Sequence, residues 1–117
     1  MNLRPIPVFL TALGLLPLFA EEKSDEQVSY YEQIRPIFQA NCHGCHQPAK
    51  SKGNYVMTTF ERLLQGGEES RATVAEDLFL SNLVTNIEID EKGEAEMPPK
   101  GDPLKRSEIE LVKKWIL

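Results

Sequence analysis

The first part of the chain differs sharply from the rest in its pattern of hydrophobic and polar residues. Residues 6–19 are almost all apolar, and a charged stretch follows at 21–27. An apolar run of about 14 residues, preceded by Arg4 and followed by Ala20, is typical of a secretory signal and is shorter than a membrane-spanning helix of about 20 residues. We therefore predict a signal peptide at 1–20, cleaved on export, and a flexible acidic tail at 21–27. Retention of the apolar segment as a membrane anchor is the alternative.

Apolar residues recur with helical spacing in four segments of the remaining chain, at 28–41, 58–65, 76–86 and 107–117. Pro36 lies inside the first segment, and proline disfavours helix at the residue before it. We therefore predict either a kink at Arg35 or a helix that begins at Pro36, with helical structure running into Cys42.

Capping residues mark the ends of two of these segments. Thr58 with Glu61, and Ser107 with Glu110, have the spacing of a capping box at the start of a helix. The glycine pair at 66–67 is expected to end the first of these two helices.

The segments between the predicted helices contain many turn-forming residues. Residues 47–57 and 87–103 include several glycines and prolines, and no stretch of the chain alternates as a strand does. These patterns predict an all-α domain at 28–117, built from about four short helices with long loops.

Composition narrows the class of protein. The chain has 117 residues, enough for one small domain, and its hydrophobic content of 41% is adequate for a folded core. A formal net charge of -5 argues against nonspecific binding to nucleic acid or anionic membranes, because both need a basic surface. Only two cysteines are present, so a scaffold of several disulfides is excluded.

The two cysteines lie in the segment Cys42-His43-Gly44-Cys45-His46, which has the C-x-x-C-H pattern of covalent haem attachment. At this spacing the two thiols can form thioethers with the two vinyl groups at one edge of a porphyrin. The imidazole of His46 then reaches the iron as an axial ligand.

Two other interpretations of the cysteine pair stay open. A redox-active disulfide is one, although the chain lacks the βαβ setting of a thioredoxin-like site. A zinc site is the other, although four protein ligands are usual and no second Cys/His cluster exists. His43 occupies one of the variable positions of the motif, and we expect it to be solvated.

A second axial ligand of the iron must come from elsewhere in the chain. Besides Met1, which leaves with the predicted signal, the candidates are Met57 and Met97. We favour Met97, because it begins Met97-Pro98-Pro99 in the long irregular segment, where prolines can hold a thioether in place without helical hydrogen bonds. An open or water-ligated sixth position is the alternative.

The order of these features resembles that of a class I cytochrome c, and more narrowly a planctomycete-type cytochrome c domain. The resemblance covers residues 28–117 and rests on the haem motif and three further segments: Ile34-Arg35-Pro36-Ile37, Met97-Pro98-Pro99-Lys100-Gly101, and a closing helix with Trp115. It implies a small helical domain wrapped around one haem c, an iron porphyrin bound covalently through Cys42 and Cys45. His46 and Met97 would be the iron ligands.

The resemblance also implies how the domain packs. The first and last helices would cross near one haem edge, with Phe38 and Trp115 in the contact. The apolar residues expected to wall the haem pocket are Leu63, Leu64, Leu78, Leu83 and Ile109.

The function implied by the resemblance is single-electron transfer in the periplasm, without enzymatic catalysis. The acidic surface favours a redox partner with a basic patch, although bulk charge does not locate the docking face. No nucleic-acid partner is expected, and membrane association is expected only if the N-terminal segment is retained.

Two alternative functions stay open. One is a haem sensor or peroxidase-like module with an open sixth position. The other is a haem domain that feeds or regulates a larger fused or partner enzyme, because the chain stops at Leu117 while the last predicted helix is still running.

Overall fold

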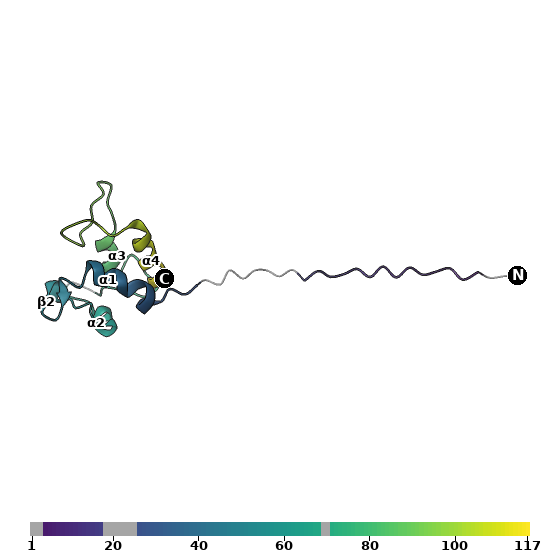
Figure 1. The fold of residues 1–117 in the computed structure, drawn as a ribbon, viewed down its shortest axis with the longest axis horizontal. Helices are drawn as coiled ribbons and strands as arrows, with labels where there is room; N and C mark the ends of the chain where they lie inside the picture. Colours follow the sequence, from purple (N-terminus) through teal and green to yellow (C-terminus); the bar gives the residue numbers. More distant parts are fainter. Residues whose placement is uncertain (1–3, 18–25, 69–70) are drawn as a thin grey trace.

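The computed structural model describes residues 4–17, 26–68 and 71–117. Residues 4–17 form neither helix nor strand, and their apolar side chains are exposed (Figure 1). The predicted cleavage site at Ala20 and residues 21–25 of the predicted tail lie outside the described residues. Within the described ranges, no helix is both long and apolar enough to cross a membrane.

Helical structure begins at Tyr30 and changes type at Arg35. A π-helical turn, η1 (Tyr30–Ile34), leads directly into α1 (Arg35–Asn41), which has a proline in its first turn. The missing N–H of a proline costs nothing there, so the α-helix can begin at this point. The N–H of Cys42 donates to the Phe38 carbonyl at 2.8 Å. The α-helix thus begins at Arg35, one residue before the predicted start at Pro36, and helical structure runs to Cys42 as predicted.

A small antiparallel sheet follows the first helix, so the expected all-α class is wrong. Strand β1 (His46–Gln47) pairs with β2 (Lys50–Ser51), and the 3-10 turn η2 (Lys52–Asn54) continues the chain. The structure is only 37% helical. Sequence patterns missed the sheet because two-residue strands are too short to show alternation, and residues 47–57 were therefore expected to form a loop.

The cap of the next helix, α2 (Phe60–Gln65), lies one residue later than predicted. The hydroxyl of Thr59, rather than that of Thr58, accepts from the Arg62 N–H at 3.3 Å. Gly66 ends the helix with a φ of 78°, a conformation that favours glycine, as the sequence predicts.

Helix α3 (Asn82–Ile87) is much shorter than the helix predicted at 76–86. The residues before it form a turn, because the Ser81 hydroxyl accepts from the Val74 N–H at 2.8 Å and donates to the Asp77 carbonyl at 2.6 Å. The Asp77 carboxylate also accepts from the Leu80 N–H at 2.9 Å. These side chains offer the backbone hydrogen bonds that compete with a helix.

The last helix, α4 (Arg106–Ile116), begins earlier than predicted. The N–H of Lys105 donates to the Glu108 carboxylate at 2.9 Å, so the cap lies at Lys105 and the predicted cap, Ser107, is an exposed residue within the helix. One face of α4 buries Ile109, Val112 and Ile116.

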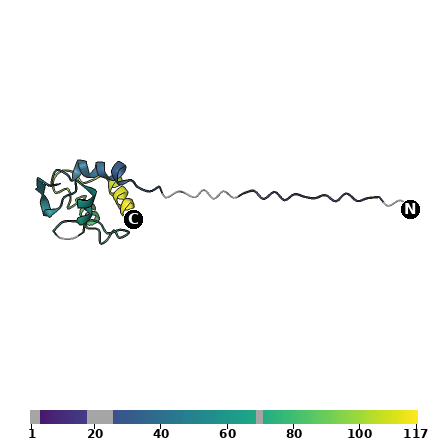
Figure 2. The same ribbon diagram turned by 90° about the horizontal axis from the view of Figure 1, so that it is seen from below.

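The core lies between α4, α3 and the first helical segment, and η1 packs on α4 (Figures 1 and 2). Phe38 is fully buried, and its ring centroid lies 6.3 Å from that of Trp115. Tyr30 and Phe60 surround the same indole, with ring centroids 5.4 and 6.4 Å from it. The predicted contact between the first and last helical segments, with Phe38 and Trp115 in it, is confirmed.

Candidate functional site

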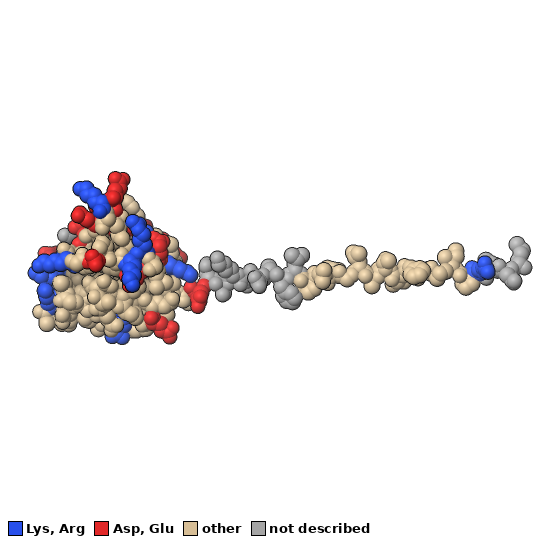
Figure 3. Space-filling view, turned by 45° about the horizontal axis from the view of Figure 1, so that its top comes forward, with Lys and Arg blue, Asp and Glu red and all other residues tan. Residues whose placement is uncertain are grey.

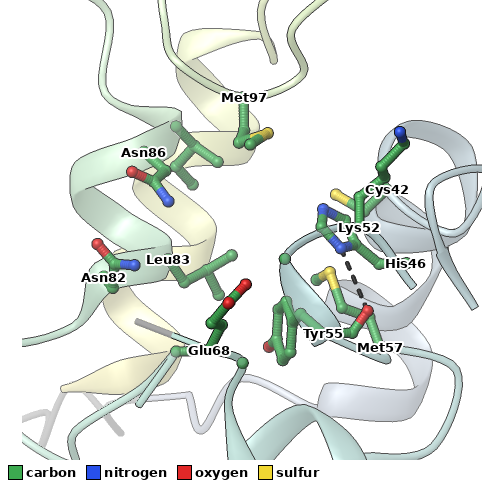
Figure 4. A pocket seen from close by; sticks show the side chains of 14 residues that line it. Cys42, His46, Lys52, Tyr55, Met57, Glu68, Asn82, Leu83, Asn86 and Met97 are labelled. Atoms are coloured by element: carbon green, nitrogen blue, oxygen red, sulfur yellow. Dashed lines mark hydrogen bonds between the residues drawn. The ribbon is translucent and has the colours of Figure 1, made fainter. Parts of the chain in front are cut away.

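Two adjoining hollows, of about 190 and 600 Å³, share the residues Cys42, His46 and Met97 in their lining. The inner hollow lies between the hairpin region and α3, and we call it the inner cavity (Figure 4). The outer one, which also includes Cys45, is called the mouth. The volume of the mouth falls within the roughly 300–1,000 Å³ typical of small-molecule and cofactor sites.

One wall of the inner cavity comes from the end of α1 and the segment that follows it. Cys42, His46, Tyr55 and Met57 lie on this wall (Figure 4). The N–H of His46 donates to the Cys42 carbonyl at 3.1 Å, and the N–H of Met57 donates to the His46 carbonyl at 2.9 Å. These bonds fold the cysteine motif into a tight turn and fix it to the segment that carries Tyr55.

The imidazole of His46 has a defined orientation. Its Nδ1 lies 3.3 Å from the Tyr55 carbonyl oxygen, which can only accept a hydrogen bond. Nδ1 therefore carries the proton in the neutral ring, which leaves the lone pair on Nε2 available to a metal ion. Metal-binding histidines usually donate their other ring N–H to a carbonyl or carboxylate in this way.

The opposite wall is formed by α3 and by Met97. Asn82, Leu83 and Asn86 extend from α3, and Met97 lies beyond them near the mouth (Figure 4). The Met97 N–H donates to the Asn86 carbonyl at 2.8 Å, which attaches the irregular segment to the end of α3. Met97 therefore faces His46 across the cavity.

Met57 and Met97 lie on different walls of the inner cavity. Met57 lies on the same wall as His46 and is almost completely buried. A haem held in this cavity would take its two iron ligands from facing walls. The arrangement therefore favours Met97 over Met57 as the second ligand.

Cys42 and Cys45 are both free thiols in the structure. Burial, and to a lesser extent the neighbouring Cys45, raises the pKa of the Cys42 thiol to about 11. Redox-active cysteines and zinc ligands need the thiolate, which a raised pKa disfavours. In the described part of the chain, no three His, Cys, Asp or Glu residues are grouped to hold a metal ion. The zinc interpretation therefore lacks a group of three such ligands among the described residues.

His43 is half-buried rather than fully solvated. Its Nε2 is buried and has no hydrogen-bond partner within the described residues. Burial lowers the pKa of His43, an effect opposed by a hydrogen bond to the Met57 backbone and reinforced by the charge of Arg35. The side chain lies outside both hollows.

The apolar lining of the cavity differs from the prediction. Of the five residues expected there, Leu83 is the one that lines the inner cavity in the described structure. Leu63 and Ile109 lie in the buried core, whereas Leu64 is 42% exposed and Leu78 borders a separate hollow near the last helix. The spacing of apolar residues identified buried faces, but it could not show which of them border the cavity.

No pattern in the sequence identified several polar residues as part of the cavity lining. Asn82, Asn86 and Glu68 all line it, and the first two share a face of α3 because they lie four positions apart. The Tyr55 hydroxyl donates to the Leu63 carbonyl at 2.9 Å, and burial raises the pKa of this phenol. Tyr55 thereby connects the His46 wall to α2.

The donor groups of this site fit a haem c. Cys42 and Cys45 supply two free thiols at the mouth, His46 supplies an oriented imidazole, and Met97 supplies a thioether on the facing wall. This combination of groups defines a c-type cytochrome domain.

The sequence profile of the Planctomycete cytochrome C family matches residues 42–101, and the chain belongs to this family. The matched region begins at the first cysteine and includes Met97. No curated protein and no solved structure matches the chain. Family membership makes this a haem-binding domain of the electron-transfer type, and it confirms the resemblance to planctomycete-type cytochrome c domains.

Proposed function

We propose that the protein transfers single electrons in the periplasm and carries one haem c, attached at Cys42 and Cys45 and ligated by His46 and Met97. The observation that carries this proposal is the placement of His46 and Met97 on opposite walls of one cavity whose mouth contains both cysteines. When bound, the haem supplies an iron that alternates between two oxidation states.

The residues of the chain bind and orient that group. The Tyr55 carbonyl holds the His46 ring with Nε2 toward the cavity, and Asn86 holds Met97 through its backbone. Leu83 and Ile87, both buried, exclude water from the α3 side. Methionine as the second ligand raises the reduction potential of a haem iron relative to a second histidine, which suits an electron carrier.

Covalent attachment is tested by mass spectrometry and a pyridine haemochrome spectrum of the purified exported protein. We expect a mass increase of one haem and a spectrum showing that both vinyl groups have become thioethers. Acid–acetone should leave the colour with the protein. Cys42→Ser and Cys45→Ser should each leave one vinyl group unreacted. Extraction of all the colour from the wild type would contradict the proposal.

The identity of the second ligand is tested with a matched pair of variants, Met97→Leu and Met57→Leu. Both replacements conserve volume, so packing changes little. We expect Met97→Leu to abolish the weak methionine-to-iron absorption band of the oxidised protein and to permit rapid binding of carbon monoxide after reduction. Met57→Leu should retain the band. Rapid carbon monoxide binding by the wild type would instead favour a sensor or peroxidase-like module.

Export is tested by N-terminal sequencing of the protein recovered from the periplasm of a host that attaches haem c. We expect the mature chain to start at Glu21, because the apolar run and Ala20 have the composition of a cleaved signal. Recovery of the full-length chain in the membrane fraction would favour a retained anchor.

A further inference from the structure

Gly67 lies in very close contact with the segment that carries Tyr55. A Cβ atom on Gly67 would lie 2.7 Å from the Gly53 carbonyl oxygen and 2.9 Å from the Tyr55 Cβ. Carbon atoms in ordinary contact are about 3.5–4.0 Å apart. A Cβ on Gly93 or Gly101 would meet no atom of the described residues within 4 Å, so this close approach is a particular feature of Gly67.

The residue after Gly67 holds the same segment by a hydrogen bond. The N–H of Glu68 donates to the Gly53 carbonyl at 2.9 Å. The far end of the Tyr55 side chain is also fixed, because its hydroxyl donates to the Leu63 carbonyl of α2 at 2.9 Å. We call Gly67 and Glu68 the brace, since together they fix the backbone from Gly53 to Tyr55.

The backbone that the brace fixes is the one that orients His46. The Tyr55 carbonyl oxygen lies 3.3 Å from Nδ1 of His46, already slightly beyond the usual range of about 2.7–3.2 Å for such bonds. A displacement of this oxygen by a few tenths of an ångström, in any direction except toward Nδ1, would lengthen or bend the bond. The orientation of the imidazole therefore depends closely on where the Tyr55 backbone lies.

We propose that Gly67 is a positioning residue for His46. By allowing the brace to pack against Tyr55, it holds the Tyr55 carbonyl at the imidazole and so helps to set the reduction potential of the haem iron. The inference rests on the proposed function, since it takes His46 as an iron ligand. A hydrogen bond at Nδ1 makes Nε2 a more basic ligand, which stabilises the oxidised iron over the reduced iron. Weakening this bond should raise the potential.

The brace acts through packed backbone and Cβ atoms rather than through charge. Charged side chains of both signs protrude from the surface of the folded part (Figure 3). Salt screens such charges, over roughly 10 Å at 0.1 M ionic strength, whereas it does not screen a contact between packed atoms. The effect of Gly67 on His46 should therefore be the same at low and high salt.

The test uses the haem-loaded, ¹⁵N-labelled protein in its reduced, diamagnetic state. The Nδ1–H proton of His46 then gives an NMR signal, and its rate of exchange with D₂O reports how often the bond to Tyr55 opens. The brace variant is Gly67→Ala. The control is Gly93→Ala, which makes the same chemical change where a φ of 83° strains the backbone but the Cβ meets no described atom. Gly93 lines neither the inner cavity nor the mouth.

We expect the Nδ1–H proton to exchange about tenfold faster in Gly67→Ala. The stabilisation of the oxidised over the reduced iron should also fall about tenfold, the low end of the range for groups that orient metal ligands. For one electron this is a rise in potential of about 59 mV. Both effects should persist from about 0.01 to 1 M salt, and Gly93→Ala should show neither. Unchanged or slower exchange in Gly67→Ala, or equal effects in both variants, would overturn the proposal.

A measurement on the wild type decides the question even if Gly67→Ala fails to fold. The Glu68 N–H and the His46 Nδ1–H are both released when the brace separates from Gly53 and Tyr55, so both should be protected from exchange to a similar degree. Protection that differs by more than about tenfold would show that they open independently and would overturn the inference. Absence of covalent haem would overturn the proposed function as well, whereas a haem-loaded protein with the wrong exchange pattern overturns the inference alone.

Discussion

Replacing Ser81 with alanine tests whether the turn before α3 is held by one buried hydroxyl. Ser81 is completely buried, and its hydroxyl accepts from the Val74 N–H at 2.8 Å and donates to the Asp77 carbonyl at 2.6 Å. Ser81→Ala leaves both backbone groups without this partner, and no water can enter the space of one oxygen atom without rearrangement. The cost of leaving buried polar groups unsatisfied is about 1–3 kcal/mol.

The free energy of unfolding of Ser81→Ala should therefore fall by about 1–3 kcal/mol. A loss of 1 kcal/mol lowers the Tm of a domain of this size by about 4–8 °C. Urea and thermal unfolding, followed by far-UV circular dichroism, give both quantities.

Ser107→Ala is the matched control, because it makes the same chemical change at an exposed position within α4. Its effect should stay within about 0.5 kcal/mol. The capping box predicted from the sequence would instead make Ser107→Ala cost about 1 kcal/mol. If Ser107→Ala proved as costly as Ser81→Ala, or if Ser81→Ala were neutral, the description of both helix starts would be refuted.

Three other variants have defined outcomes. Gly67→Ala should destabilise by about 1–3 kcal/mol in urea unfolding, because its Cβ would lie 2.7 Å from the Gly53 carbonyl oxygen and 2.9 Å from the Tyr55 Cβ; a neutral result would contradict this close approach. Phe38→Ala should cost about 3–5 kcal/mol by the same measurement, since the ring is fully buried, and a loss below 1 kcal/mol would argue against that burial. Glu88→Gln should lower stability by at most about 1 kcal/mol near pH 8, because the pair with Lys113 is partly exposed.

The stability lost in Glu88→Gln should depend on pH, and the pKa of Lys113 gives the direction of this dependence. The hydrogen bond that Lys113 donates to the Glu88 carboxylate raises the pKa of Lys113 above its ordinary value of 10.5. A raised lysine pKa stabilises the fold below the unfolded pKa, and this contribution is lost as the pH rises through the folded pKa. The difference between wild type and Glu88→Gln should thus be constant from pH 7 to 9 and disappear as the pH rises through the raised pKa of Lys113. A difference that grew with pH would contradict the assignment.

The chemistry of the site was far more predictable than the details of the fold. Cys42, Cys45 and His46 were identified because haem attachment imposes a fixed local spacing, which the sequence displays directly. Met97 was favoured by its prolines, and the structure adds what the sequence could not show, namely that it faces His46 across the cavity. Whether these groups ligate an iron stays a prediction.

The errors in the fold have local physical causes. Strands β1 and β2 have two residues each, which is too short to produce an alternating pattern. The helix predicted at 76–86 lost its first half because Ser81 and Asp77 hydrogen-bond to the backbone, an effect that apolar spacing does not register. The grouping of Lys50, Lys52 and Lys100 at the mouth was not visible in the sequence for another reason: Lys100 lies 50 positions after Lys50.

The position of the protein's single tryptophan makes it a useful probe of unfolding. Trp115 lies against Tyr30 and Phe38, where the two ends of the folded domain meet. Its fluorescence therefore reports separation of the terminal segments, while visible absorption would report events at the iron. Recording both signals in one unfolding experiment would show whether the chain ends come apart before the haem environment is lost.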